Sequence, residues 1–238
     1  MHAPRMWVEE NKEGHHACML TFYPEIESNF LREDIEYIIL LDCSCSMAEG
    51  TSLDEARAGA LVLLHELPPG TRYNVVCFGE TFDELFVVSQ GKTDANVRTA
   101  SSYVSAARPV WGSTELWRPL RALQLLSPSQ SSSPRAVFLF SDGMASDAPR
   151  ALALASAMAE HTRLFTFGVG AAPSRHFLRS LARVSGGAAE MLESSMKSRW
   201  RHQIKAQLER AAQPCLKAIE VCIFLYYEVK AGNLKKEV

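Results

Sequence analysis

Short apolar runs alternate along the chain with longer stretches in which apolar residues recur every three or four positions. Continuous apolar runs predict strands that are covered on both faces; these runs are 37–41, 73–78, 136–140 and 164–169. The helical spacing predicts helices that each bury one face; these stretches are 53–67, 95–107, 116–126, 148–161, 175–184 and 200–212.

Two shorter apolar stretches complete the predicted sheet. The stretch 82–88 follows the strand 73–78 after only a brief turn at Gly79 and Glu80, and so short a connection predicts an antiparallel edge strand. The stretch 188–192 predicts a last short strand. Regular alternation of strands and helices predicts an α/β fold: a doubly wound, mostly parallel, Rossmann-like sheet with helices on both faces.

The flanking segments do not follow this alternation. Residues 17–22 predict one strand, ended by Pro24 and preceded by a turn at 11–14. A lone strand cannot bury its face, so it must pair with the body or with something absent. We therefore divide the chain into a leading remnant at 1–27, an α/β domain at 35–213 and an unassigned tail at 214–238. A Ser- and Pro-rich stretch at 127–134 predicts an exposed loop.

Composition and charge narrow the class of protein. The 238 residues are 47% apolar and 22% charged, which is typical of one globular α/β domain. A net charge of −2 gives no electrostatic case for nucleic acid, and the basic run 197–202 is interpreted as a solvated helix face. No apolar run reaches the roughly 20 residues that span a bilayer, so we expect no membrane association.

Cysteine usage and the first residues indicate the compartment. The six cysteines form neither a CxxC pair nor a zinc-binding spacing, and the first residues lack the apolar core of a signal peptide. These features favour a reduced, cytoplasmic protein, with the nucleus as a further compartment.

The clearest chemical signal follows the first strand of the α/β domain. Asp42, Ser44 and Ser46 alternate directly after the buried run, and alternate side chains of an extended loop point the same way. All three offer oxygen, which hard divalent cations such as Mg²⁺ prefer as ligands. Taken alone, the same pattern is also explained by loop and helix capping.

Two further oxygen donors are expected at the same edge of the sheet. Asp142 follows the strand 136–140 and precedes Gly143, while Thr114 lies in a Gly-containing loop that opens a helix. In doubly wound sheets, the ligand crevice lies beyond the carboxyl ends of the strands where the strand order reverses. We therefore expect these two side chains to converge with Asp42, although about a hundred residues separate the two carboxylates.

This constellation resembles the metal-ion-dependent adhesion site of von Willebrand factor A domains, over a span from about Glu36 to Gln213. The resemblance implies a bound Mg²⁺, or Mn²⁺ in its place, with Ser44, Ser46 and Thr114 as direct ligands. It implies that Asp42 and Asp142 act through water or switch between states. It also implies a protein partner that donates a Glu or Asp carboxylate to the open position.

A narrower resemblance concerns the A-type domains of the vault-associated poly(ADP-ribose) polymerase family. It is carried by the segments 4–9, 17–20, 41–44 and 161–165. The resemblance implies that 1–27 is the remnant of a domain related to the inter-alpha-trypsin inhibitor heavy chain. It also implies vault-particle proteins as possible partners and a full-length protein that is an NAD-dependent ADP-ribosyltransferase. Residues from 219 onward depart from the family pattern.

Several neighbouring residues have simpler interpretations than metal binding. Cys43 and Cys45 flank the ligands and are expected to pack rather than to act in redox control. Asp54 and Glu55 suit the positive end of a helix dipole. Glu115 is expected to face solvent, with a supporting contact to the site as the alternative.

Three functional hypotheses remain at this level. The favoured one is a metal-dependent protein-binding module without catalytic residues. An enzyme on the same scaffold is less well supported, because 42–46 holds no glycine and Gly168-Val169-Gly170 is not followed by a third glycine. A secreted relative of the inter-alpha-trypsin inhibitor heavy chains is the third hypothesis.

Overall fold

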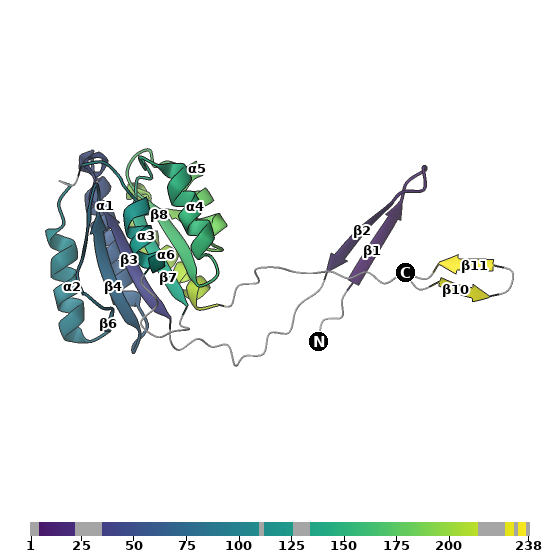
Figure 1. Cartoon of the computed structure of the whole chain (residues 1–238), viewed down its shortest axis with the longest axis horizontal. Helices are drawn as coiled ribbons and strands as arrows, with labels where there is room; N and C mark the ends of the chain where they lie inside the picture. Colours follow the sequence, from purple (N-terminus) through teal and green to yellow (C-terminus); the bar gives the residue numbers. More distant parts are fainter. Residues whose placement is uncertain are drawn as a thin grey trace. The chain divides into compact units, whose positions relative to one another are not determined.

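The computed structural model describes residues 5–21, 35–109, 112–125, 134–213, 227–230 and 233–236. The chain divides into two compact units, Met1–Arg32 and Glu33–Val238, and each is described by itself below. Figure 1 shows the elements of both units.

The second unit is built on a seven-stranded sheet. Its strands are β3 (Glu36–Asp42), β4 (Arg72–Phe78), β5 (Phe82–Glu84), β6 (Gln90–Gly91), β7 (Arg135–Ser141), β8 (Thr162–Gly168) and β9 (Ala189–Met191). The order is β5-β4-β3-β7-β8-β9, with β6 paired to β4. All pairings are parallel except those of β5 and β6 with β4, which confirms the predicted mostly parallel sheet and its antiparallel edge.

Helices cover both faces of this sheet (Figure 1). One face packs against α1 (Ser52–Glu66), α2 (Asp94–Ala106) and α6 (Lys197–Ala212). The other face packs against α3 (Trp117–Leu125), α4 (Ala148–Met158) and α5 (Arg175–Val184). Two short 3₁₀ helices, η2 (Cys45–Ala48) and η3 (Ser194–Met196), precede α1 and α6.

Alternation along the central strand explains the two layers. All seven residues of β3 are buried. Ile39 and Leu41 join the apolar cluster under α1, whereas Ile38 and Leu40 join the cluster under α3 to α5. Successive strand side chains point to opposite faces, so a continuous apolar run supplies two cores at once.

The strand order reverses between β3 and β7. The chain runs from β3 outward to β4, and later returns to add β7 on the other side of β3. Leu41 of β3 lies in register with Phe140 of β7, so the carboxyl ends of these two strands are adjacent. Polar residues that follow the two strands are thereby brought to the switch point of the sheet.

The first unit contains a hairpin where the sequence predicted a single strand. Strand β2 (His16–Thr21) pairs in antiparallel fashion with β1 (Arg5–Glu10), and the turn between them falls at the predicted place. The side chain of Asn11 stabilises this turn by accepting hydrogen bonds from the amides of Glu13 and His15. The prediction that this strand pairs with the body or with something absent is therefore wrong, because β1 is its partner.

Two elements end at least three residues before the predicted bound. The strand predicted at 82–88 ends at Glu84, because the side chain of Asn74 takes over the pairing by bonding both the amide and the carbonyl of Phe86. The helix predicted at 148–161 ends at Met158, since the chain must turn before β8 begins at Thr162.

Parts of the flanking predictions lie outside the described residues. Residues 127–133 of the predicted loop, residue 126 of the helix predicted before it, and residues 214–226 of the unassigned tail belong to this group. Later in the tail, β10 (Tyr227–Lys230) pairs with β11 (Asn233–Lys236). Within the described ranges, every helix is too short or too polar to cross a bilayer.

Candidate metal centre

Asp42 closes β3 and is fully buried. Its carboxylate accepts a 2.5 Å hydrogen bond from the hydroxyl of Ser141 and a 3.0 Å bond from the amide of Ser44. Burial raises the pKa of Asp42 to about 6; the hydrogen bonds from Ser141 and Ser44 oppose the rise, and the charge of Asp142 adds to it. The Asp42 carboxylate therefore lacks a cationic partner among the described residues, and it is affected by the charge of the Asp142 carboxylate.

The two serines lie in the turn that follows. Ser44 is fully buried, while Ser46 is half-buried in η2, and their Oγ atoms are 3.1 Å apart. The amide of Ser44 bonds back to the Asp42 carboxylate, which fixes the turn and brings the three side chains together. The predicted convergence of Asp42, Ser44 and Ser46 is thus present in this turn.

Thr114 reaches the same rim from the loop before α3. Its side chain is buried, at 5% exposure, and its loop is held by two backbone bonds. The carbonyl of Gly112 accepts from the amide of Cys45 at 2.9 Å, and the amide of Glu115 donates to Gly79 at 2.9 Å. Gly112 has φ +61°, a conformation that a residue without a Cβ adopts at no steric cost.

Asp142 follows β7 and is 8% exposed. One of its carboxylate oxygens accepts a 2.9 Å bond from the amide of Met144. The next turn lies against the Thr114 loop, because the amide of Ser146 donates to the carbonyl of Thr114 at 3.1 Å. Gly143 has φ +78°, and an added Cβ would lie 3.0 Å from Leu178, so this turn requires glycine twice over.

Hydrogen bonds therefore join the three loops that carry the five predicted ligands. Cys45, in the turn after β3, bonds to Gly112 in the loop before α3. Ser146, in the turn after β7, bonds to Thr114 in that same loop. Ser141, at the end of β7, bonds to Asp42 at the end of β3. The predicted ligands at this rim are Asp42, Ser44, Ser46, Thr114 and Asp142.

The donor set is chemically uniform. Two carboxylates and three hydroxyls offer only oxygen, which suits a hard cation such as Mg²⁺ or Mn²⁺ better than a soft one. Within the part of the chain that the structure describes, no group of three or more His, Cys, Asp or Glu side chains is placed to hold a metal. Beyond the two carboxylates, the predicted side-chain ligands at this rim are the three hydroxyls of Ser44, Ser46 and Thr114.

Ser141 is a functional neighbour that sequence reasoning missed. It lies directly before Asp142, and its hydroxyl bonds both the Asp42 carboxylate and the amide of Gly143. The sequence did show a polar residue at the end of an otherwise apolar strand, but the metal-site motif assigns no role to this position.

Glu55 has a larger role than a favourable helix charge. It is buried, at 1% exposure, and accepts hydrogen bonds from Thr51, Ser194 and the amide of Gly170. Burial raises its pKa, but these bonds outweigh burial and leave the pKa below its ordinary value. Asp54, by contrast, is exposed and pairs with Arg57, as a surface charge would.

Three other interpretations can be compared with the structure. Cys43 is buried as expected, whereas Cys45 is exposed, so the prediction that both thiols pack is wrong for Cys45. Glu115 does not simply face solvent: it accepts from the Ser113 hydroxyl and from the indole Nε1 of Trp117.

Comparisons with known proteins show the family of this chain. The sequence model of the von Willebrand factor type A domain family matches residues 35–191. Protein mono-ADP-ribosyltransferase PARP4 of Mus musculus is 38% identical over 221 residues, which is 92% of this chain and 11% of that protein. The chain thus spans only about a tenth of the length of this relative.

Two solved structures share the fold. The manganese-loaded TRAP protein of Plasmodium vivax has a TM-score of 0.58 and 16% identity, covering 85% of this chain and 78% of that one. Proximal thread matrix protein 1 from the mussel byssus, with a zinc-occupied MIDAS motif, has a TM-score of 0.55 and 14% identity, covering 75% of this chain and 46% of that one. Because the family model covers more than half of the sequence, the chain belongs to the von Willebrand factor type A domain family.

Proposed function

We propose that residues 35–213 form a metal-ion-dependent protein-binding module. In this proposal the side chains of Asp42, Ser44, Ser46, Thr114 and Asp142 hold one Mg²⁺, or Mn²⁺ in its place. A Glu or Asp carboxylate from a partner protein completes the coordination. The observation that carries the proposal is the pair of serine hydroxyls 3.1 Å apart, beside the buried Asp42 carboxylate and on loops bonded to those of Thr114 and Asp142.

The electrostatics of the rim support a cation. Asp42 and Asp142 are both buried; burial raises the pKa of Asp42, and the charge of Asp142 adds to that rise. A buried carboxylate is stable only when it is paired or well hydrogen-bonded, and two close carboxylates share that need. A divalent cation supplies the missing positive charge and uses the neighbouring hydroxyls as further ligands.

The named metal sites of related folds support the same assignment. One solved neighbour is described as manganese-loaded and another as having a zinc-occupied MIDAS motif. At 16% and 14% identity these proteins share the fold with this chain, and the identity of its cation rests on its own donors. Oxygen-only donors favour Mg²⁺ or Mn²⁺ over Zn²⁺.

The proposal assigns no catalytic step to this segment. The relative PARP4 is named as a mono-ADP-ribosyltransferase, and this chain spans 11% of it. For a full-length protein that contains this segment, we propose an NAD-dependent ADP-ribosyltransferase activity located outside the segment. We also propose association with vault-particle proteins and residence in the cytoplasm, with the nucleus as a second compartment. Release of nicotinamide from NAD by the chain alone contradicts the non-catalytic assignment.

The direct test is a titration of the whole chain with Mn²⁺, followed by electron paramagnetic resonance of the free ion, with Mg²⁺ as competitor. We expect one bound Mn²⁺ for the wild type, displaced by Mg²⁺, and loss of binding by at least about tenfold when both direct serine ligands are removed in Ser44→Ala/Ser46→Ala. The matched control is Ser101→Ala, because the Ser101 hydroxyl is buried without a hydrogen-bond partner among the described residues. Equal Mn²⁺ binding by the double variant and the wild type contradicts the site.

Capture of partners then tests the binding module itself. The immobilised chain is exposed to a cytosolic extract with Mg²⁺ or with EDTA, in parallel with the Ser44→Ala/Ser46→Ala variant. We expect the same proteins to be lost on adding EDTA and on removing the serines. Proteins retained equally under all three conditions contradict a role for the cation in partner binding.

A further inference from the structure

A groove beside the candidate metal centre has a basic and aromatic lining. We call it the α3 groove; it has a volume of about 380 Å³ and is lined by Phe82, Trp117, Arg118, Arg121, Ala122 and Leu125. The first of these belongs to β5, and the others belong to α3. The groove is therefore formed where one helix meets the antiparallel edge of the sheet.

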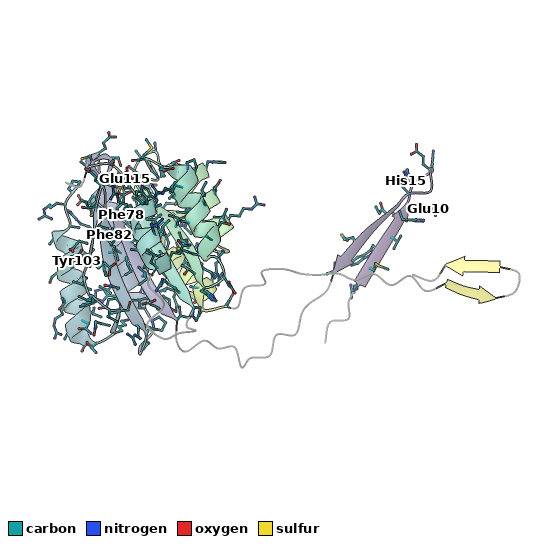
Figure 2. The ribbon with its side chains drawn as sticks, viewed as in Figure 1. Glu10, His15, Phe78, Phe82, Tyr103 and Glu115 are labelled. Atoms are coloured by element: carbon teal, nitrogen blue, oxygen red, sulfur yellow. The ribbon has the colours of Figure 1, made fainter. Side chains whose placement is uncertain are left out.

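The loop that carries Thr114 connects this groove to the metal centre. Thr114 lies three positions before Trp117, and the intervening Glu115 donates its amide to Gly79 and accepts from the indole of Trp117. Figure 2 labels Glu115 and Phe82; Phe82 lies on β5, where it pairs with Phe78 of β4. A ligand that spans a few residues can thus contact both places, because three residues of chain span at most about 11 Å.

The aromatic part of the groove is held in one orientation. The guanidinium of Arg150 lies 3.4 Å from the centroid of the Trp117 ring, and that of Arg118 lies 5.0 Å from it. Both contacts are within the range of cation–π attraction, and the bond to Glu115 fixes the indole edge. The ring is half-buried and so presents a preformed apolar surface.

The positive charges of the groove are available to a ligand. Arg118 and Arg121 are both exposed, and neither forms an ion pair with any described residue. Of the nearby carboxylates, Glu115 accepts from Ser113 and Trp117, and the charge of Arg118 also acts on it. The others have different partners. Asp83 accepts from the hydroxyl of Tyr103, and the Glu80 carboxylate lies against Gly112, where an added Cβ would be 2.5 Å from it.

We propose that the α3 groove binds an acidic segment of the partner protein that also carries an aliphatic or aromatic side chain. The two guanidinium groups pair with carboxylates of the segment, and the apolar side chain packs against Phe82, Ala122 and the Trp117 ring. The proposal rests on the proposed function, because the same partner supplies the carboxylate for the cation. It adds a second contact that selects acidic partners.

Charge favours a protein over a nucleic acid as the occupant. The chain has a net charge of −2, and the groove offers two exposed arginines rather than an extended basic track. Nucleic-acid affinity depends on the number of phosphates that are neutralised, so two charges give little. A short acidic segment needs only the charges that are present.

The test uses the whole chain and a fluorescein-labelled peptide of alternating glutamate, aspartate and leucine residues, read by fluorescence anisotropy. We expect saturable binding that weakens at least about tenfold in Arg118→Glu/Arg121→Glu and by a smaller factor in Arg118→Gln/Arg121→Gln. The matched control is Arg179→Glu, an equally exposed arginine of α5 outside the groove, which should leave binding within about twofold of the wild type.

Running every variant in Mg²⁺ and in EDTA separates the two proposals. Weaker binding of the charge-reversed variant in both conditions supports the groove, even where Mg²⁺ itself has no effect and the proposed metal-dependent function fails. Equal affinities for the charge-reversed variant and the wild type overturn the groove proposal whatever Mg²⁺ does. Displacement of the peptide by oligothymidylate at lower concentration than by unlabelled peptide also overturns it, in favour of a nucleic acid.

Discussion

The hydroxyl of Ser141 donates a 2.5 Å hydrogen bond to the carboxylate of Asp42, across the junction of β7 and β3. The same hydroxyl accepts a 2.9 Å bond from the amide of Gly143. One small side chain thus supports a buried charge and also fixes the turn that presents Asp142. It connects the two halves of the candidate metal centre, which are about a hundred residues apart in the sequence.

We expect Ser141→Ala to lower the free energy of unfolding of the metal-free chain by about 1–3 kcal/mol, because a buried carboxylate loses a donor. Urea denaturation in EDTA measures this loss. Ser101→Ala is the control, since it removes a buried hydroxyl that has no partner among the described residues. An unfolding midpoint equal to that of the wild type contradicts a supporting role for Ser141.

A buried ion pair lies at the opposite end of the same two strands. Glu36 accepts a 2.8 Å bond from Arg135 and a 2.6 Å bond from the hydroxyl of Ser89, and Arg135 also donates to the carbonyl of Leu123 at 2.5 Å. We expect Arg135→Met to reduce the free energy of unfolding by about 3–5 kcal/mol, since it leaves a buried carboxylate without its cation. Chemical denaturation measures the change.

A double variant distinguishes charge pairing from packing at this pair. Glu36→Leu/Arg135→Met removes both charges and should recover most of the lost stability. The surface control is Arg201→Met, because Arg201 is 77% exposed in its pair with Glu66, and it should cost less than about 1 kcal/mol. If the double variant is as unstable as Arg135→Met alone, the unpaired charge of Glu36 is not the cause of the lost stability.

The hydrogen bonds of Glu55 predict a pH dependence. Because its pKa is lower in the folded chain than its ordinary value of 4.5, the charged form stabilises the fold above that pH. The contribution is lost as the pH falls through the folded pKa. We expect the difference in free energy of unfolding between wild type and Glu55→Gln to shrink from about pH 5 to about pH 3. A difference that stays constant over this range contradicts the assignment.

Two glycines give a steric prediction with an internal control. A Cβ on Gly187 would lie 1.8 Å from the carbonyl oxygen of Leu164, whereas a Cβ on Gly91 would meet nothing within 4 Å. We expect Gly187→Ala to reduce stability by more than about 2 kcal/mol, because the obstacle is the backbone of a central strand. Gly91→Ala should have little effect or stabilise slightly. Equal melting temperatures for the two variants are the contrary result.

Local patterns predicted most of the fold because each element buries a face. The continuous apolar run at 37–41 appears within β3, and the helix expected at 175–184 has those same bounds. Pairing across the sequence was harder to predict. The residues 5–10 gave no clear apolar run, so β1 was missed, although it pairs along its whole length with β2.

The candidate site was predictable where oxygen donors follow strands directly, as Asp42 and Asp142 do. What the sequence did not reveal was how these donors are supported. The partners of Glu55 come from Thr51, Gly170 and Ser194, which are brought together only by packing of α1 against the later loops. Contacts of this kind leave no local signature in the sequence.

The sheet is terminated on one side by β5 and β6, of three and two residues, and on the other by β9, of three residues. Such brief border strands expose few unpaired backbone groups to a strand from another molecule. Within the described residues, this domain therefore offers little template for edge-to-edge aggregation. A second copy of the domain brought close to the first would therefore find few backbone groups to pair with at either border of the sheet.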